Sequence, residues 1–127
     1  MKAGREHSVP LSPQAWDILQ KAKARWPKNT EPSGLIFPGE KSKALSDMTL
    51  TQLMRRMEQP YTVHGFRASF RTWGADIAHY EHDMLEIALS HIVGDATVRA
   101  YHRSDMVEKR RKLMIEWAQY LSISNMP

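Results

Sequence analysis

The chain has 127 residues, of which 42% are hydrophobic and 25% are charged. This balance is typical of one globular domain with a core of its own, and it excludes a disordered chain. The absence of cysteine excludes disulfides and thiolate metal sites. No apolar run approaches the roughly 20 residues of a membrane span, and no signal peptide is visible, so we expect a cytoplasmic protein. A net charge of +4 permits a nucleic-acid partner without establishing one.

The first residues, MKAGREHSVPLS, carry a short strand signal at positions 7–9. A lone strand has no partner for its backbone hydrogen-bonding groups. We therefore interpret residues 1–10 as the strand remnant of a β-hairpin whose other strand precedes residue 1, which would make the chain a fragment. The alternative is a frayed end.

The first helix is predicted to begin with Ser12 as its N-cap and Pro13 at its first position. Its apolar residues recur at helical spacing, and Pro27 ends it. Residues 27–45 form a long connection rich in proline and glycine. The apolar residues 35–37 within this connection are expected to be extended and buried.

The next two helices are each predicted to bury one apolar face. Ser46 is expected to cap the second helix, and Pro60 to close it. Its buried face would comprise Leu50, Leu53, Met54 and Met57. The third helix is expected to begin at Thr62 or Val63. Its core stripe would comprise Phe66, Phe70, Trp73 and Ile77. A neighbouring face would present His64, Arg67 and Arg71.

The remainder is also predicted to be helical. A short helix is expected around residues 82–90, a break at Gly94-Asp95, and helix again at 97–102. A last helix at 104–121 would be capped by Ser104, and residues 122–127 would form a polar tail. The fold class is therefore mainly α, with a short β remnant at the N-terminus.

Four residues have side chains suited to phosphate chemistry, and each has a structural alternative. Arg67 could grip two phosphate oxygens with its planar guanidinium, or form a surface salt bridge. His64 could exchange protons near neutral pH, or it could cap a helix. His91 could also act on a phosphate through its imidazole, or it could bond a carbonyl at the core edge. Tyr101 could be a nucleophile, or a half-buried tyrosine with a bonded hydroxyl. Each residue alone leaves its alternatives open.

A run of cations surrounds Tyr101 and continues beyond it: Arg99, Arg103, Lys109, Arg110, Arg111 and Lys112. Such a run is usually a solvated helix face, but beside a phosphate site it could hold the DNA backbone. His79 and His82 form no HExxH pattern, and the sequence has no phosphate-binding glycine loop and no GxSxG motif. We therefore expect neither a metal nor a cofactor.

The order of two sequence boxes points to a family. HGFRASFRTW contains His64-x-x-Arg67, and LSHIVGDATVRAYHR contains Leu89-x-His91 followed by Tyr101. Together they resemble the signature of the tyrosine recombinases, the phage-integrase family. The segments REHSVPLS and GLIFPG are similar to the prophage and genomic-island integrases of satellite-phage type. The resemblance covers nearly the whole chain and implies a helical catalytic domain of the DNA breaking–rejoining type.

The resemblance also implies a role for each site residue. Tyr101 would attack a DNA phosphate and form a 3′-phosphotyrosyl link, releasing a 5′-hydroxyl. Arg67 would clamp the non-bridging oxygens, and His91 would hydrogen-bond the same phosphate. His64 would assist proton transfer, and Lys2 would protonate the leaving oxygen. The residues implied at the DNA backbone are Arg71, Arg99, His102 and Arg103. The family's reaction needs no metal or cofactor.

One residue of the family's pattern has no counterpart. The family uses a first arginine upstream of the hairpin lysine, whereas no arginine precedes Lys2, and Arg5 follows it. Residues 1–127 therefore correspond to the C-terminal portion of the catalytic domain. We expect this chain by itself to be inactive, or nearly so, in strand exchange.

The resemblance implies double-stranded DNA with att sites as the partner, and integration or excision of a prophage or genomic island at the nucleoid. The full-length protein would act as a homotetramer on DNA, with an excisionase or a host DNA-bending protein as further partners and no membrane contact. Two rival interpretations remain. A non-catalytic DNA-binding module would be indifferent to Tyr101→Phe, and a protein-interaction bundle would show no salt-dependent DNA binding.

Overall fold

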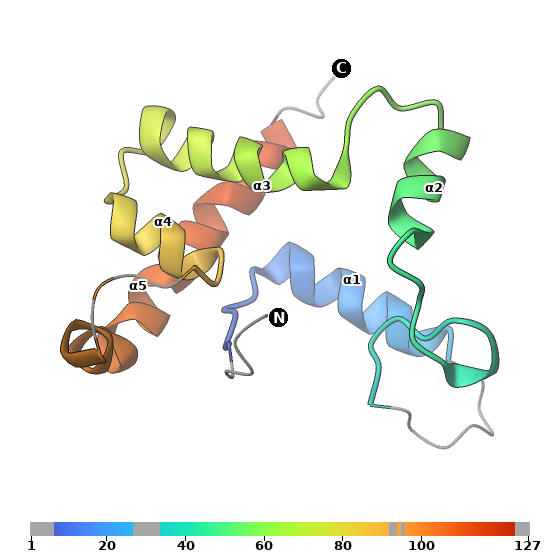
Figure 1. Ribbon diagram of the computed structural model, residues 1–127, viewed down its shortest axis with the longest axis horizontal. Helices are drawn as coiled ribbons and strands as arrows, with labels where there is room; N and C mark the ends of the chain where they lie inside the picture. The colour runs from blue at the N-terminus through green and yellow to red at the C-terminus, as the bar shows by residue number, and fades with distance from the viewer. Residues whose placement is uncertain (1–6, 27–33, 92–93, 95, 124–127) are drawn as a thin grey trace.

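The computed structural model describes residues 7–26, 34–91, 94 and 96–123, apart from the side chains of residues 96–105. The elements are α1 (Pro13–Ala24), η1 (Glu40–Ser42), α2 (Thr49–Arg56), α3 (Val63–Thr72), η2 (Trp73–Ile77), α4 (His82–Ala88) and α5 (Ala96–Ile123). Figure 1 shows α3, α4 and α5 gathered together, with α1 against α5 and with α2 beyond the start of α3. The predicted mainly helical fold is confirmed. None of the described helices is both long and apolar enough to span a membrane.

Two helix starts form as predicted because a hydroxyl caps each of them. Ser12 accepts a hydrogen bond from the Ala15 amide at 3.2 Å, at the start of α1. Thr62 accepts one from the Gly65 amide at 3.0 Å, at the start of α3. An N-cap of this kind contributes about 1 kcal/mol to helix stability. The Thr62 cap also fixes the first residue of α3, and therefore the face on which Arg67 lies.

The core lies where α3, η2, α4 and α5 meet. Its buried members are Phe70, Trp73, Leu85 and Leu113. Trp117 of α5 packs against them, with its ring centroid 5.5 Å from that of Phe70 and 4.9 Å from that of Trp73. Aromatic pairs like these contribute about 0.5–1.5 kcal/mol each beyond the area they bury. The core therefore fixes α3 and α4 against each other.

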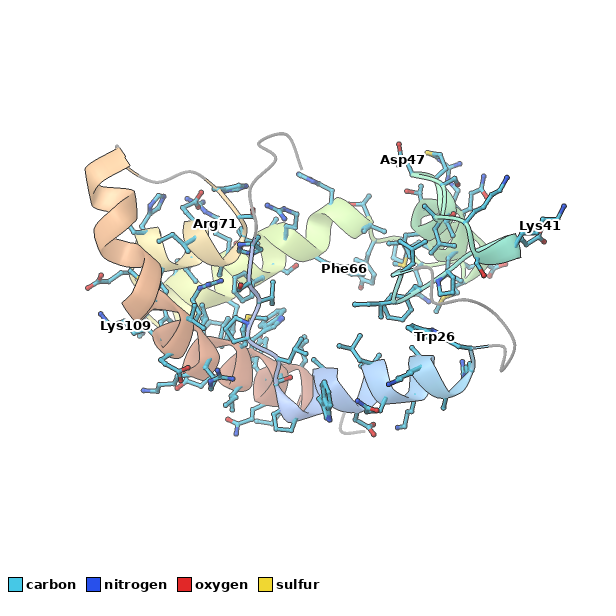
Figure 2. All side chains as sticks on the ribbon, turned by 90° about the horizontal axis from the view of Figure 1, so that it is seen from below. Trp26, Lys41, Asp47, Phe66, Arg71 and Lys109 are labelled. Atoms are coloured by element: carbon cyan, nitrogen blue, oxygen red, sulfur yellow. The ribbon has the colours of Figure 1, made fainter. Side chains whose placement is uncertain are left out.

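The aromatic stripe predicted for α3 is half right. Phe70 and Trp73 are buried, whereas Phe66 and Ile77 are 52% and 56% exposed. Figure 2 shows Phe66 toward the α2 end of α3 and Arg71 toward the α4 end. The stripe is buried only where α4 and α5 pack against it.

The buried face of the second helix and the buried segment before it are not present. Leu50 of α2 and Met57 just after its end are 50% and 55% exposed, and Ile36 and Phe37 are 50% and 53% exposed. Helical spacing correctly indicates that α2 is a helix. It does not specify a neighbour, and α2 contacts α3 while standing clear of the core (Figure 1).

Two predicted helix starts are also wrong. The N-cap of α2 is Met48, and the expected cap, Ser46, instead shares a hydrogen bond of 3.0 Å with the hydroxyl of Thr49. The two helices expected on either side of Ser104 are one continuous helix, α5, which also takes in residues 122 and 123 of the expected tail. A serine costs a helix interior only a fraction of a kcal/mol, so the uninterrupted backbone hydrogen bonding of α5 outweighs it.

The strand expected at positions 7–9 is absent from the described residues, where positions 7–10 have no strand structure, and residues 1–6 lie outside the description. A buried arginine holds this segment instead. Arg110 of α5 is 5% exposed and donates to the Ser8 carbonyl at 2.9 Å and the Met106 carbonyl at 3.2 Å. Burial lowers the pKa of the Arg110 guanidinium below its usual value. Arg110, expected on a solvated face, is therefore a structural residue.

The contact between η2 and α4 generates a stability prediction. A Cβ added at Gly74 would lie 2.3 Å from Cδ2 of Leu85, which is buried. We expect Gly74→Ala to lower the free energy of unfolding by about 1–3 kcal/mol through overpacking, measured by urea denaturation. In a Leu85→Ala background the same change should cost less, because the truncated side chain leaves room for the methyl group. An equal cost in both backgrounds would contradict this packing.

Candidate functional site

Five polar side chains from α3, α4 and the residues just after α4 form one connected set. We call them the α3–α4 polar network: Arg67, Arg71, His82, Glu86 and His91. The network lies at the surface, with the side chains of Arg71 and His91 each 49% exposed. Glu86, at its centre, is only 15% exposed.

The network joins the two sequence boxes. Arg67 Nη2 donates to the Leu89 carbonyl at 2.7 Å and lies 2.9 Å from Nε2 of His91. The Leu89 carbonyl is at the C-terminal end of α4, where the helix dipole favours a cation. Arg67 and His91 are separated by 24 positions in the chain. The packing of α4 beside α3 brings them to one place.

Glu86 connects this pair to Arg71. Its Oε2 lies 2.6 Å from Nδ1 of His91, and its Oε1 accepts from Nε of Arg71 at 2.5 Å. His82, one turn before it on α4, approaches Oε1 at 3.8 Å and contacts Nη2 of Arg71 at 3.0 Å. The hydrogen bond from His91, followed by that from Arg71, lowers the pKa of the Glu86 carboxyl below its usual value. Glu86 is therefore a carboxylate at neutral pH.

The backbone at the end of α4 fixes His91 a second time. The His91 amide donates to the Glu86 carbonyl at 2.8 Å, and the Ser90 amide donates to the Ile87 carbonyl at 3.0 Å. This pair of bonds is a Schellman motif, which turns the chain out of the helix through one left-handed residue. That residue is Ser90, with φ at 62°. Both the backbone and the ring of His91 are thus tied to Glu86.

The other predicted site residues differ in how much of each the structure describes. His64 lies one turn before Arg67 on α3, and its side chain is exposed and makes no hydrogen bond with another described residue. Tyr101 lies in α5, and its side chain is outside the description. The same holds for the side chains of three predicted backbone-binding residues, Arg99, His102 and Arg103. Lys2 lies outside the described residues.

Arg71, predicted to bind the DNA backbone, has internal partners in Glu86 and His82. From the sequence, Glu86 was not assigned to the site, and His82 was considered only as a metal ligand. A physical signal for Glu86 was available, because an acidic side chain in the last turn of a helix opposes the helix dipole. A carboxylate in that position calls for cationic partners, and Arg71 and His91 supply them.

Tyr80 is tied to the fold through both its hydroxyl and its ring. Its hydroxyl donates to Oε2 of Glu116 at 2.7 Å, and its ring packs near Trp73. Burial, followed by the bond to Glu116, raises the pKa of Tyr80 to about 12. Tyr80 is therefore held protonated and poorly suited to be a nucleophile.

Comparison with known proteins yields a consistent group of relatives. The chain is 32% identical over 131 residues to an integrase of Enterobacteria phage P4, covering 98% of this chain and 29% of that protein. It is 33% identical over 121 residues to the prophage integrase IntZ of Escherichia coli (strain K12), covering 93% and 29%. It is 30% identical over 132 residues to the prophage integrase IntA of the same strain, covering 98% and 30%. The chain thus spans less than a third of the length of these relatives. Neither a family model nor a solved structure matches it.

The left-handed turn after α4 generates a second stability prediction. A residue with a Cβ pays roughly 1–2 kcal/mol for the left-handed conformation that Ser90 adopts, and glycine avoids most of this cost. We expect Ser90→Gly to raise the free energy of unfolding by about 1 kcal/mol, because glycine is the preferred residue at this position of a Schellman motif. Thermal and urea denaturation would measure the change. A loss of stability would show that φ does not limit this turn.

The lowered pKa of Glu86 predicts a dependence of stability on acid. The unfolded chain binds a proton at the ordinary carboxyl pKa, near 4.5, whereas the folded chain resists protonation until lower pH. The contribution of Glu86 is therefore present above that value and lost as the pH falls through the folded pKa. Urea denaturation between neutral and acid pH should show a smaller acid loss for Glu86→Gln than for the unmodified chain. Parallel curves would contradict the ionic contacts of Glu86.

Proposed function

Because this chain is related over nearly its whole length to a segment of the phage and prophage integrases, we propose that it belongs to the catalytic domain of a site-specific DNA recombinase. The reaction would insert or excise a mobile element through a tyrosine–DNA intermediate. The observation that carries the proposal is the 2.9 Å contact between Arg67 and His91. These two residues come from different sequence boxes, and both are suited to hold one phosphate.

The proposed reaction conserves the number of phosphate ester bonds. The Tyr101 hydroxyl attacks a phosphodiester, loses its proton to His64, and forms a bond between its oxygen and phosphorus. The bond from phosphorus to the 5′-oxygen breaks, and Lys2 supplies the proton of the departing 5′-hydroxyl. Attack by another 5′-hydroxyl on the 3′-phosphotyrosyl link would reverse these steps and join a new strand. No ATP is needed, because the covalent intermediate retains the ester bond.

Arg67 and His91 would act on the non-bridging oxygens of that phosphate. Negative charge grows there during attack, and fixed donors are most effective at the place where charge develops. In the structure, Arg67 Nη2 is occupied by the Leu89 carbonyl and His91. A guanidinium has five donors, so Arg67 can retain the helix-end carbonyl and still turn others to a phosphate. His64, exposed one turn earlier on α3, is free to approach the nucleophile.

The proposal extends to partners and residues beyond the network. Double-stranded DNA with att sites would be the substrate, bound by a homotetramer of the full-length protein in the cytoplasm, at the nucleoid. An excisionase or a host DNA-bending protein would bias the direction. Arg99, His102 and Arg103 would hold the DNA backbone, and Arg71 would contribute its remaining donors. We propose that residues 1–127 by themselves bind DNA and do not exchange strands.

A segment exchange tests the proposal. In the phage P4 integrase, the segment matched by this chain would be replaced by residues 1–127, and covalent protein–DNA product would be measured on a nicked attachment site. We expect Tyr101→Phe to abolish the product while DNA binding survives. Arg67→Lys should reduce it by roughly 10²-fold or more, because lysine keeps the charge but loses the planar fork.

Tyr61→Phe is the matched control, because Tyr61 is 66% exposed and lies outside the polar network. It should leave the covalent product unchanged. Product formation that survives Tyr101→Phe would refute the assigned nucleophile. If the exchanged protein and the chain alone both lack salt-dependent binding to duplex DNA, the recombinase proposal itself fails.

A further inference from the structure

We propose that Glu86 is a positioning residue of this site: its carboxylate sets the tautomer of His91 and aims Nε2 at the place where Arg67 presents its guanidinium. The role of that place as a phosphate site rests on the proposed function. The orientation of the ring rests on the contacts of Glu86 alone, so the two claims can fail separately.

The hydrogen bond between Glu86 and His91 determines which ring nitrogen of His91 carries the proton. A carboxylate only accepts hydrogen bonds, so at 2.6 Å the proton must be on Nδ1 of His91. In the neutral ring, Nε2 then has a lone pair. Arg67 Nη2 can only donate, and it lies 2.9 Å from that nitrogen. Glu86 at Nδ1 and Arg67 at Nε2 therefore both stabilise the tautomer of His91 that is protonated on Nδ1.

The side chain of Glu86 itself has little freedom to move. Its Oε1 is held by Nε of Arg71 at 2.5 Å, and its carbonyl accepts from the amide of His91 at 2.8 Å. Its side chain is the least exposed in the three ion pairs that it makes, at 15%. A restrained acceptor of this kind fixes the direction of the ring that donates to it, as an ordered catalytic shell requires.

Binding of a phosphate would require the His91 ring to become a cation. A phosphate oxygen accepts hydrogen bonds, so Nε2 of His91 must carry a proton to donate to it. A ring that donates through both nitrogens is a cation. The charged or titratable groups around Glu86 are Arg71 from α3, His82 from α4, and His91. Glu86 is the carboxylate that contacts His91, whereas the neighbouring Asp83 contacts His82 at 3.4 Å, so Glu86 supplies the negative charge that faces the imidazolium.

A purely structural role is the alternative, in which Glu86 merely ties α3 to α4 through Arg71. The two roles differ in what Glu86→Gln does to the ring. The amide keeps the size of the side chain but has one acceptor and one donor group. Arg71 cannot accept, so the amide oxygen should face Arg71 and the amide nitrogen should face Nδ1 of His91. His91 can adapt by moving its proton to Nε2, which would place two donors against each other and break the bond to Arg67.

The experiment is long-range ¹H–¹⁵N NMR of the histidine rings in the 127-residue chain without DNA. At pH about 8.5, well above the ordinary histidine pKa of about 6.5, the spectrum reports which ring nitrogen carries the proton. We expect His91 to be protonated on Nδ1 in the unmodified chain and mainly on Nε2 in Glu86→Gln. Glu108→Gln is the matched control, since Glu108 pairs with Arg111 on the surface of α5, and it should leave His91 unchanged.

An Nε2-protonated His91 in the unmodified chain would overturn the proposal, and this outcome does not depend on the folding of any variant. An unchanged tautomer in a folded Glu86→Gln would also overturn it. Glu86→Ala provides a second variant, in which Nδ1 loses its acceptor and only Arg67 still favours the Nδ1-protonated ring, so the share of the Nε2-protonated ring should rise. These readouts need no DNA. If the expected tautomers are found but neither this chain nor the exchanged integrase binds duplex DNA, the proposed function is refuted and the role of Glu86 stands.

Discussion

The carboxylate of Glu86 is the interaction on which the geometry of the site depends. It holds Arg71 with one oxygen and His91 with the other, and its own backbone carbonyl binds the His91 amide. Half-exposed ion pairs contribute only about 0–1 kcal/mol to folding, so this network is not what keeps the domain folded. The aromatic core brings α3 and α4 together, and Glu86 determines how the polar groups between them are oriented.

Because the core and the polar network both depend on contacts between helices, the sequence predicts local features better than these contacts. Local signals are complete in a few residues, and they succeed for α1 and α3: Ser12 caps α1 as predicted, α3 begins at Val63 as predicted, and helical spacing finds both helices. The same local logic places His64 and Arg67 one turn apart on α3. The family's spacing adds His91, and the fold does bring its ring to Arg67.

The caps predicted at Ser46 and Ser104 are local errors, whereas the other failures concern which element packs against which. The apolar spacing of α2 predicts a buried face, but Leu50 and Met57 are about half exposed because the core lies against α4 and α5 instead. Arg110 looks like one cation in a solvated run, yet it is buried against the carbonyl of Ser8, 102 positions away. Glu86 was overlooked because its importance comes from partners on another helix. Such contacts are long-range, and a periodicity confined to one element contains no information about them.

An anion arriving at this site meets cations that already have partners. Arg67 is bound to the end of α4 and to His91, and Arg71 is bound to Glu86. This arrangement differs from a simple basic surface, where side chains extend into water and pair with any phosphate. Here a ligand has to compete for donors whose directions are fixed, which favours a single phosphate in one orientation over diffuse contact with a backbone.

The central claim is that Arg67 and His91 hold one DNA phosphate together. The most direct test is an NMR titration of the 127-residue chain with short duplex DNA, following the His91 ring nitrogens and the Arg67 guanidinium. We expect both signals to shift together, His91 to gain a proton on Nε2 while Nδ1 stays protonated, and added salt to reverse the change. Shifts confined to the cations of α5, with Arg67 and His91 unmoved at saturating DNA, would contradict it.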